Sequence, residues 1–561
     1  MKHLLADIRW AATKLVLAAS RIFVLPFKTL KSAHPILFRR VRRLSHLTVT
    51  MRDGVRLNTD VYLPIGAPAS PVMLIRMPYG IRESYTYMPA VGRYWAQHGF
   101  ACVIQDVRGR FGSEGVWQPG AHEKDDGFDT IAWIAAQPWC DGRVSMTGES
   151  YYALTQWAAA AARPPALVSI APGDMGLDQH TMLYEGGAFC LGTTGMWLCD
   201  QSGRDYINYY RLDTTTRPVT EMARRGGITA PLFEAAALRP ERSEFWDEYD
   251  FSDLIDGVAV PVLVWSGWFD NLLPGTIHTW NELERRRPGG AQRLLLGPTD
   301  HETSVDFDGR VGRIPVAEAS RSWDRVLEFT EDVLRGWPEN GAQRPRTSAF
   351  IVGADTWIDD TAVPTGEDRT VLWLREDGTL AASAGEGTLG YTYDPDDPVR
   401  WWAARDLWAA SRYLGDRRRI KDRDDVLRFD GAVLPADIDV LGATEVHLTV
   451  SYTAPSTDFT AALVDIFPDG HTQLVTEWIR RLRPEERSDA ETSFVIRLPP
   501  TGYRFAHGHR IGLEISSSNF DRWDLNLNDT PVPATTAQAR TSFQLLHLAH
   551  CSLALPTRRL A

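Results

Sequence analysis

The apolar residues of this chain follow two different rhythms. In the N-terminal part, short apolar runs are separated by stretches with helical spacing, of which residues 89–98 and 125–136 are the clearest. The apolar runs are residues 72–76, 101–105, 143–147, 167–170, 262–266 and 293–296. Buried strands that alternate with helices predict a parallel sheet covered on both faces. A segment with hairpin character, residues 48–63, precedes this set.

After residue 343 the period of the apolar pattern becomes two. The segments that alternate in this way, or read as short strands beside those that do, are residues 445–451, 459–467, 473–479, 493–498, 510–516 and 542–548. Many short strands separated by Gly and Pro turns predict an all-β sandwich, for which a jelly roll is one expected topology.

Residues 175–255 interrupt the first set of strands and show no buried-strand run, but they are rich in Tyr, Trp, Met and Gly. An insertion at this place predicts a helical cap over the carboxyl edge of the sheet, where open α/β sheets bind ligands. The predicted domains are a leader (1–46), the first part of an α/β core (47–174), the cap (175–255), the second part of the core (256–343) and the β-sandwich (344–561).

The leader is strongly basic. It contains ten Lys or Arg and one acid, Asp7, so its net charge is about +9, and the whole-chain charge of −12 leaves about −21 for the rest. Basic side chains interrupt its apolar stretches before they reach the roughly 20 residues of a spanning helix, and a secretory signal is not convincing. The leader is therefore either an amphipathic segment resting on an anionic membrane surface or a helical arm that is packed on the protein body or frayed. We favour the second interpretation.

Chain length, net charge and cysteine count limit the classes of protein to which this chain can belong. At 561 residues the chain is too long for a single core, and its net charge of −12 argues against a nucleic-acid binder. Its five cysteines, an odd count without a CxxC pair, are expected to be reduced and mostly buried. We therefore expect a cytoplasmic protein, held at the inner face of the membrane if the leader binds lipid.

Residues 143–153 contain the strongest local signal for chemistry. An apolar strand ends at Gly148, Ser150 stands at the tip, and an Ala-rich helical segment follows at once. This is the arrangement of a nucleophile elbow, which presents a serine hydroxyl above a sheet. Tyr152 occupies the position of the usual second glycine, so the short pattern is incomplete. The strand–turn–helix context nevertheless predicts a nucleophile at Ser150 rather than a structural N-cap serine.

A serine nucleophile needs a general base that an acid holds in the right tautomer. In parallel sheets that carry a nucleophile elbow, the acid and the base follow the serine in chain order, each after a later strand. Asp270 comes directly after the run 262–266, and His301 comes after the run 293–296. Asp300 is a rival acid, but it adjoins the histidine and follows the wrong strand. We predict a triad of Ser150, Asp270 and His301.

The oxyanion of a tetrahedral intermediate needs hydrogen-bond donors. The backbone N–H of Tyr151 directly follows the nucleophile and is the first candidate. The second should come from the loop after the run 72–76, where Tyr79 offers a phenolic O–H. The alternative for Tyr79 is an ordinary half-buried tyrosine.

Other motifs give no further site. Gly109, Gly112 and Gly115 lack the Lys-Ser/Thr of a phosphate loop, and His122-Glu123 lacks the partner histidine of a zinc site. The acidic segment 394–398 is best interpreted as a rigid solvated loop. No metal and no cofactor are expected.

Several motifs together resemble the family of bacterial cocaine esterase and X-Pro dipeptidyl-peptidase. They are residues 76–79, 105–115, 129–134, 148–151, 267–270 and 297–301, followed by 503–505, 508–511 and 516–518. They span roughly residues 47–550 in order. The departures are Ala153, where a glycine is usual, and Thr299-Asp300, where the family often has Trp and a small residue. The resemblance implies an α/β-hydrolase core, a helical cap, a C-terminal jelly-roll domain and a tyrosine oxyanion donor, which falls on Tyr79.

The expected reaction is hydrolysis of an ester or amide through an acyl-enzyme, with a small-molecule substrate. Relatives that recognise a free α-amine need acidic residues in the pocket, but Asn271 and Leu272 after the predicted acid carry no charge. We therefore favour an esterase or acylase for apolar acyl groups over an X-Pro dipeptidyl-peptidase, although Asp174, Asp178 or Glu185 of the cap could serve. A non-catalytic protein on the same fold and a membrane-surface binding protein are the alternatives from other classes, and a homodimer is left open.

Overall fold

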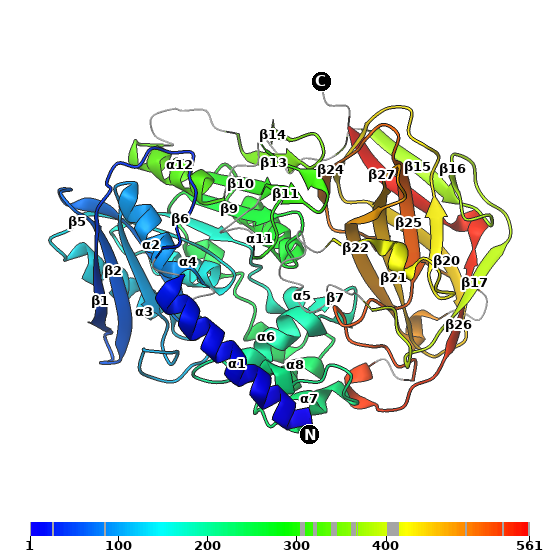
Figure 1. Ribbon diagram of the computed structural model, residues 1–561, viewed down its shortest axis with the longest axis horizontal. Helices are drawn as coiled ribbons and strands as arrows, with labels where there is room; N and C mark the ends of the chain where they lie inside the picture. The colour runs from blue at the N-terminus through cyan, green and yellow to red at the C-terminus, as the bar shows by residue number, and fades with distance from the viewer. Residues whose placement is uncertain are drawn as a thin grey trace.

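The computed structural model describes residues 2–24, 27–83, 86–302, 309–317, 322–337, 345–360, 366, 368–400, 414–487, 491–529 and 532–558. The chain forms an α/β part and a β part that lie side by side, with short helices of a cap between them (Figure 1). A 22-residue helix, α1 (Lys2–Phe23), runs along the outside.

A ten-stranded sheet forms the α/β part. Across the sheet its strands are β1 (Val41–Thr50), β2 (Arg56–Pro64), β4 (Ala101–Asp106), β3 (Ser70–Met77), β5 (Cys140–Glu149), β6 (Leu167–Gly173), β9 (Val262–Gly267), β10 (Gln292–Gly297), β13 (Thr347–Ile351) and β14 (Thr356–Asp360). The seven strands from β4 to β13 run parallel, and the pairs at both edges are antiparallel. All six predicted buried strands lie in this parallel region, which confirms the predicted sheet.

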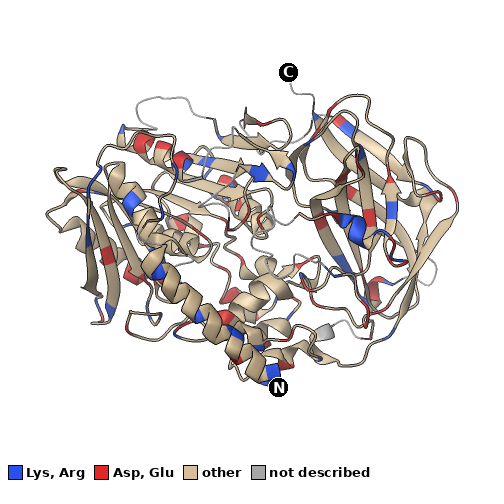
Figure 2. Ribbon diagram, viewed as in Figure 1, with Lys and Arg blue, Asp and Glu red and all other residues tan. Residues whose placement is uncertain are grey.

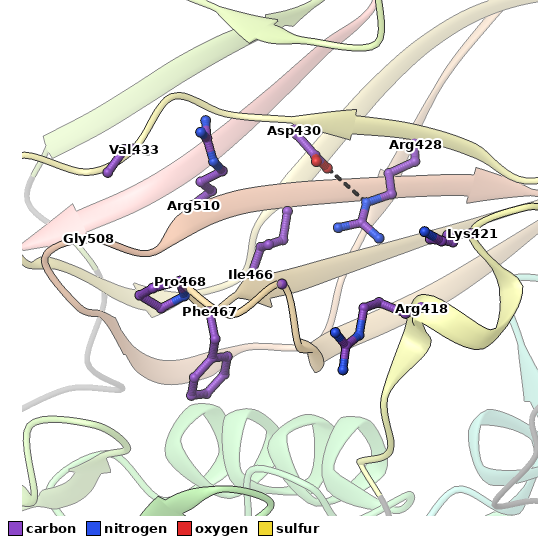
Figure 3. Close-up of a pocket in the computed structure, with 11 residues that line it drawn as sticks. Arg418, Lys421, Arg428, Asp430, Val433, Ile466, Phe467, Pro468, Gly508 and Arg510 are labelled. Carbon is purple, nitrogen blue, oxygen red and sulfur yellow. Dashed lines mark hydrogen bonds and ion pairs between the residues drawn. The ribbon is translucent and has the colours of Figure 1, made fainter.

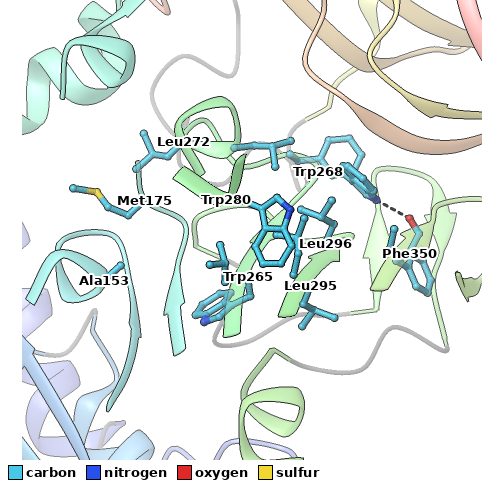
Figure 4. Close-up of a cluster of buried hydrophobic side chains, with 14 of the residues drawn as sticks. Ala153, Met175, Trp265, Trp268, Leu272, Trp280, Leu295, Leu296 and Phe350 are labelled. Atoms are coloured by element: carbon cyan, nitrogen blue, oxygen red, sulfur yellow. Dashed lines mark hydrogen bonds between the residues drawn. The ribbon is translucent and has the colours of Figure 1, made fainter. Parts of the chain in front are cut away.

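The connecting helices in the described part of the chain are α2 (Met88–Gln97), α3 (Glu123–Ala135), α4 (Tyr151–Ala161), α11 (Leu273–Arg286) and α12 (Ser322–Leu334). Helix α4 is buried from its first residue to Ala160 because small side chains let it pack closely. A Cβ added at Gly127 of α3 would meet the Cβ of Ala159 at 2.7 Å. Large aromatic side chains such as Trp265 and Trp280 fill the core beside the central strands (Figure 4).

The segment predicted as a cap consists mainly of short helices. They are α5 (Gln179–Leu183), η1 (Leu191–Gly195), α6 (Met196–Asp200), η2 (Tyr209–Arg211), η3 (Val219–Glu221), α7 (Met222–Arg225), α8 (Pro231–Ala237), α9 (Glu244–Asp247) and α10 (Leu254–Gly257), with the hairpin β7 (Tyr184–Glu185) and β8 (Ala188–Phe189). The apolar core of the cap also contains Phe520 and Ala534, so the cap packs on the β part as well.

The β part consists of two antiparallel sheets, as predicted. The larger contains β15 (Asp368–Leu374), β16 (Leu380–Ala381), β17 (Thr388–Tyr393), β19 (Ile438–Gly442), β20 (Glu445–Tyr452), β23 (Thr492–Arg497), β24 (Thr501–Phe505), β26 (Ser542–His547) and β27 (Ser552–Arg558). The smaller contains β18 (Leu427–Asp430), β21 (Thr457–Ile466), β22 (Thr472–Leu482) and β25 (Arg510–Ser516).

Two segments lie in other units than the predicted boundaries suggest. Strand β1 begins at Val41, so residues 41–46 pair with β2 instead of belonging to a separate leader. Strands β13 and β14 extend the ten-stranded sheet, although they follow the predicted boundary at residues 343 and 344, which lies outside the described residues. Strand β13 is parallel to β10, and β14 pairs with β13 antiparallel, so the change of the apolar period after residue 343 does not coincide with the end of the ten-stranded sheet.

Two chain-wide expectations can be compared with the described residues. All five cysteines are free, and only Cys140 is not fully buried. Among these residues, no helix has both the length and the apolar character that crossing a bilayer requires.

Candidate functional site

Ser150 stands between the end of β5 and the start of α4. Its backbone angles are φ 58° and ψ −135°, a conformation that L-residues rarely adopt. Its amide donates to the carbonyl of Gly173 at the end of β6, at 3.0 Å, which holds the turn against the neighbouring strand. Such a sharp turn between strand and helix projects the serine from the carboxyl edge of the sheet.

Gly148 is required for this turn. Its φ is +131°, and a Cβ built on it would meet the ring of Tyr152 at 2.5 Å. Tyr152 stands where the short motif usually has its second glycine, and its ring also packs on that of Tyr79, with centroids 5.4 Å apart. The departure from the motif therefore adds an aromatic contact next to the serine and leaves the turn intact.

Asp270 and His301 lie just beyond the ends of β9 and β10 and contact each other. The His301 Nδ1 is 2.7 Å from the Asp270 Oδ2. The other carboxylate oxygen, Oδ1, accepts from the amide of Leu272 at 2.5 Å, so the carboxylate is held on both sides. Asp300, the rival acid, instead accepts from the amide of Glu302 at 3.1 Å.

The surroundings of His301 stabilise its protonated form. Burial lowers the pKa of the imidazole. The nearby acids, Asp270 first and then Asp174 and Glu302, raise it by more than burial lowers it, so the pKa rises to about 10. The imidazole is therefore a stronger base than free histidine.

Two further acids lie beside this pair. Asp174 directly follows β6 and is fully buried. Burial, and next the charge of Asp270, raises the pKa of Asp174 well above its usual range, which favours the neutral carboxyl. Burial also raises the pKa of Glu149, directly before the serine, to about 7.

Asp174, Asp270 and His301 each offer an atom within 4.8 Å of the others, which is also a spacing that a metal ion could use. The contact between His301 and Asp270 already has the length of a charge-assisted hydrogen bond. An acid–base pair therefore accounts for the arrangement, and we assign no metal to it.

Tyr79 approaches the serine from the loop after β3. Its hydroxyl lies 3.3 Å from the Ser150 Oγ and accepts a 2.9 Å hydrogen bond from the indole Nε1 of Trp197. Burial raises the pKa of the Tyr79 phenol to about 12, so the group keeps its proton at neutral pH. Because Trp197 donates to this oxygen, the phenol proton is directed away from the indole, which leaves it able to donate to another acceptor.

Tyr151 is the first residue of α4, so its amide has no acceptor within the helix. Its side chain holds the helix start in place: the hydroxyl donates to the Glu123 Oε1 at 3.0 Å and accepts from the Gly120 amide at 2.7 Å. Glu123 in turn pairs with the fully buried Arg76 at 2.9 Å. Through Glu123 at the start of α3, these contacts connect the end of β3 with the start of α4, and Tyr79 and Ser150 lie next to these two ends.

The cap acids proposed as ammonium ligands have different surroundings. Asp178 pairs with Arg242. Glu185 accepts from the Trp523 indole at 2.7 Å and lies 3.4 Å from Arg522. Only Asp174 of the three lies beside the predicted triad.

A separate hollow of about 620 Å³ opens in the β part (Figure 3). Arg418, Lys421, Arg428 and Arg510 line it, and Asp430 offsets part of their charge through a 2.8 Å contact with Arg428. None of the predicted site residues lines this hollow.

The structure thus brings Tyr79 to Ser150 and Asp270 to His301. Nothing in the sequence indicated Trp197, because it belongs to no motif and its partner is 118 positions away. Glu149 lies inside the motif that predicts the nucleophile, but the burial that raises its pKa depends on tertiary structure.

Two family models match the chain. The model described as X-Pro dipeptidyl-peptidase (S15 family) matches residues 53–303, and the model described as X-Pro dipeptidyl-peptidase C-terminal non-catalytic domain matches residues 340–553. Among curated proteins, the cocaine esterase of Rhodococcus sp. strain MB1 Bresler is 31% identical over an alignment 531 residues long, which covers 86% of this chain and 92% of that protein.

Two solved structures share the architecture over nearly the whole chain. An aminopeptidase from the marine sediment archaeon Thaumarchaeota archaeon has a TM-score of 0.81 at 23% identity, covering 94% of this chain and 98% of the other. An alpha-amino acid ester hydrolase has a TM-score of 0.79 at 23% identity, with the same coverage. At this identity the similarity demonstrates a common fold.

Proposed function

Because the chain belongs to the family of bacterial cocaine esterase and X-Pro dipeptidyl-peptidase (S15), and is therefore a serine hydrolase of ester or amide bonds, we propose that Ser150, Asp270 and His301 are its catalytic triad. The observation that carries this proposal is the 2.7 Å contact between His301 and Asp270 at the sheet edge where Ser150 lies. Tyr79 and the amide of Tyr151 are the proposed oxyanion donors.

The reaction has two steps, acylation of Ser150 and hydrolysis of the acyl-enzyme, and His301 accepts and returns one proton in each. His301 removes the Ser150 proton while Oγ attacks the carbonyl carbon, and Tyr79 and the Tyr151 amide stabilise the oxyanion. The imidazolium then gives its proton to the leaving group, and the bond to that group breaks. Water attacks the acyl-enzyme with His301 as base, and the acid is released as the serine regains a proton.

We further propose that esters of apolar acyl groups are preferred over X-Pro peptides. An α-ammonium group needs an ionised carboxylate, but Asp178 and Glu185 already have cationic or hydrogen-bonding partners. Asp174 does not compensate for this, because burial favours its neutral form. Aromatic groups lie near the proposed triad instead. Trp197 donates to the Tyr79 hydroxyl at 2.9 Å, and the buried Phe269 directly precedes Asp270.

The test compares an aryl ester of an apolar acid with an X-Pro anilide on the same enzyme preparation. The kcat/KM for the ester should be higher by at least about tenfold after correction for the uncatalysed rates, a difference of about 1.4 kcal/mol in transition-state binding. A preference for the anilide would reverse our ranking and make the X-Pro dipeptidyl-peptidase the better assignment.

The oxyanion proposal predicts graded losses for two variants. Tyr79→Phe should lower kcat by about 10²–10³, the usual cost of removing one oxyanion donor. Trp197→Phe keeps the phenol but removes the indole N–H that orients it, a loss of about 1 kcal/mol or roughly fivefold in kcat. Steady-state kinetics with an aryl ester measure both. If Tyr79→Phe left kcat unchanged, the phenol would not be an oxyanion donor.

Location, substrate class and assembly are properties of the whole protein and not of the site alone. We propose a cytoplasmic enzyme with a small-molecule ester or amide as substrate, and a homodimer is left open for direct measurement of mass in solution.

A further inference from the structure

Helix α1 has an outer face that is apolar and exposed. Seven large side chains on it are each between 53% and 72% exposed: Leu4, Leu5, Ile8, Leu15, Val16, Ile22 and Phe23. At 100° per residue they lie on one side of the helix, together with small residues such as Ala12 and Ala19. We call these seven residues the outer face. An exposed apolar stripe of this length on a soluble surface usually marks an interaction site.

The opposite side of α1 is already fixed to the protein. Ala6 is buried, Trp10 makes an edge-on ring contact with Tyr209 at 5.5 Å, and the Thr13 hydroxyl lies 3.1 Å from that of Tyr210. The outer face therefore cannot turn inward to complete a core without breaking these contacts.

Polar contacts at both ends of α1 strengthen this attachment. Asp7 accepts from Arg211 of η2 at 2.8 Å, and Arg21 pairs with Glu83 at 3.1 Å. The helix thus bridges the cap and the loop before α2, and Figure 1 shows it lying across the outside of the molecule. A surface that binds the outer face would therefore lie on the side of the molecule where η2 of the cap contacts α1.

Cationic side chains flank the outer face. Arg9 lies directly beside the apolar stripe, and Lys14 lies on the other flank, between the stripe and the attached side, with its Nζ 5.3 Å from the centroid of the Trp10 ring; both are exposed. Figure 2 shows basic residues along α1. Helix α1 itself contains four Lys or Arg and one acid, a net charge of +3, whereas the whole chain has a net charge of −12.

We propose that the outer face of α1 docks this protein on the surface of a membrane that contains anionic lipids, with the helix parallel to the membrane plane. An apolar stripe between two cationic borders is the arrangement that inserts among acyl chains while its cations meet lipid headgroups. A second copy of the chain is disfavoured as the occupant, because it would bring two helices of net charge +3 together. This proposal does not depend on the proposed enzymatic function.

The test is co-sedimentation of the full-length protein with vesicles of phosphatidylcholine alone or with 30% phosphatidylglycerol. Deleting the leader up to Leu47 is unsuitable, because residues 41–46 pair in β1. The variant Ile8→Glu/Leu15→Glu/Ile22→Glu instead changes only exposed positions. The native protein should bind the anionic vesicles at least tenfold more tightly than the neutral ones, and the variant should lose at least tenfold of that binding.

A matched control places three glutamates at exposed apolar positions elsewhere, Val116→Glu/Val433→Glu/Val495→Glu. It adds the same charge and should keep at least half of the vesicle binding. Both variants should hydrolyse a soluble aryl ester at the native rate, which shows that they are folded.

Three outcomes would overturn the proposal: equal binding to both vesicle types, equal losses in the two variants, or no vesicle binding by the native chain. If light scattering shows a dimer that the α1 variant alone converts to a monomer, and vesicles are not bound, the outer face is a contact between two copies. None of these outcomes affects the assignment of Ser150 as nucleophile.

Discussion

Replacing Ser150 with alanine is expected to lower kcat for an aryl ester by at least about three orders of magnitude and to abolish labelling by a fluorophosphonate probe. The probe forms a covalent bond to an activated serine Oγ, so the native chain should take up one equivalent. The variant has no Oγ to attack the carbonyl, and the rate that remains comes from substrate binding and the oxyanion donors alone. Intact-protein mass and active-site titration measure the two effects.

Ser145→Ala is the matched control. Ser145 lies on the same strand, β5, and its Oγ accepts from the Ser169 hydroxyl at 2.8 Å within the buried core. This variant should keep its label and its activity per folded molecule. Labelling that persisted in Ser150→Ala, at one equivalent, would assign the nucleophile to another residue.

Replacing Asp270 with asparagine is expected to reduce kcat by about 10⁴, because an amide cannot hold the imidazole in the tautomer that accepts the serine proton. The same change should move the pH profile. In the native enzyme, burial lowers the pKa of His301, but the charge and the hydrogen bond of Asp270 raise it by more. The pKa is therefore raised to about 10. The active base is the neutral imidazole, so kcat/KM of the native enzyme should rise with pH from neutrality into the alkaline range.

Loss of the Asp270 charge removes the main cause of the raised pKa, and the inflection of the Asp270→Asn profile should therefore lie at lower pH than that of the native enzyme. Profiles of kcat/KM between pH 6 and 10.5 measure the shift. Asp300→Asn is the control, since Asp300 accepts from the Glu302 amide and is not assigned to the triad. If Asp300→Asn caused the larger loss and the larger shift, the acid of the triad would have to be reassigned.

The proposed site illustrates which contacts a sequence can predict. Ser150, Asp270 and His301 follow strands whose parallel order can be inferred from apolar runs, and parallel strands bring their carboxyl ends to one edge. Tyr79 was found in the same way, as a residue just after a strand. Trp197 follows no strand, and its 2.9 Å bond to Tyr79 depends on how the cap folds back over the sheet.

Charge environments depended even more on tertiary structure. From the sequence, Asp174, Asp178 and Glu185 were equivalent candidates for binding an ammonium group. The fold pairs Asp178 with Arg242 and Glu185 with Trp523, whereas it buries Asp174 beside Asp270. A pKa depends on burial and on neighbours within a few ångströms, and neither can be inferred from chain position alone.

The sequence by itself determined the parallel sheet, the cap, the sandwich and the order of the proposed catalytic residues, because apolar periodicity and short turn motifs are local properties of the chain. Tertiary structure alone decided that β13 and β14 complete the α/β sheet and that α1 is attached by one face with the other exposed. Both depend on which surfaces meet between segments far apart in the chain, and local pattern carries no information about the partner.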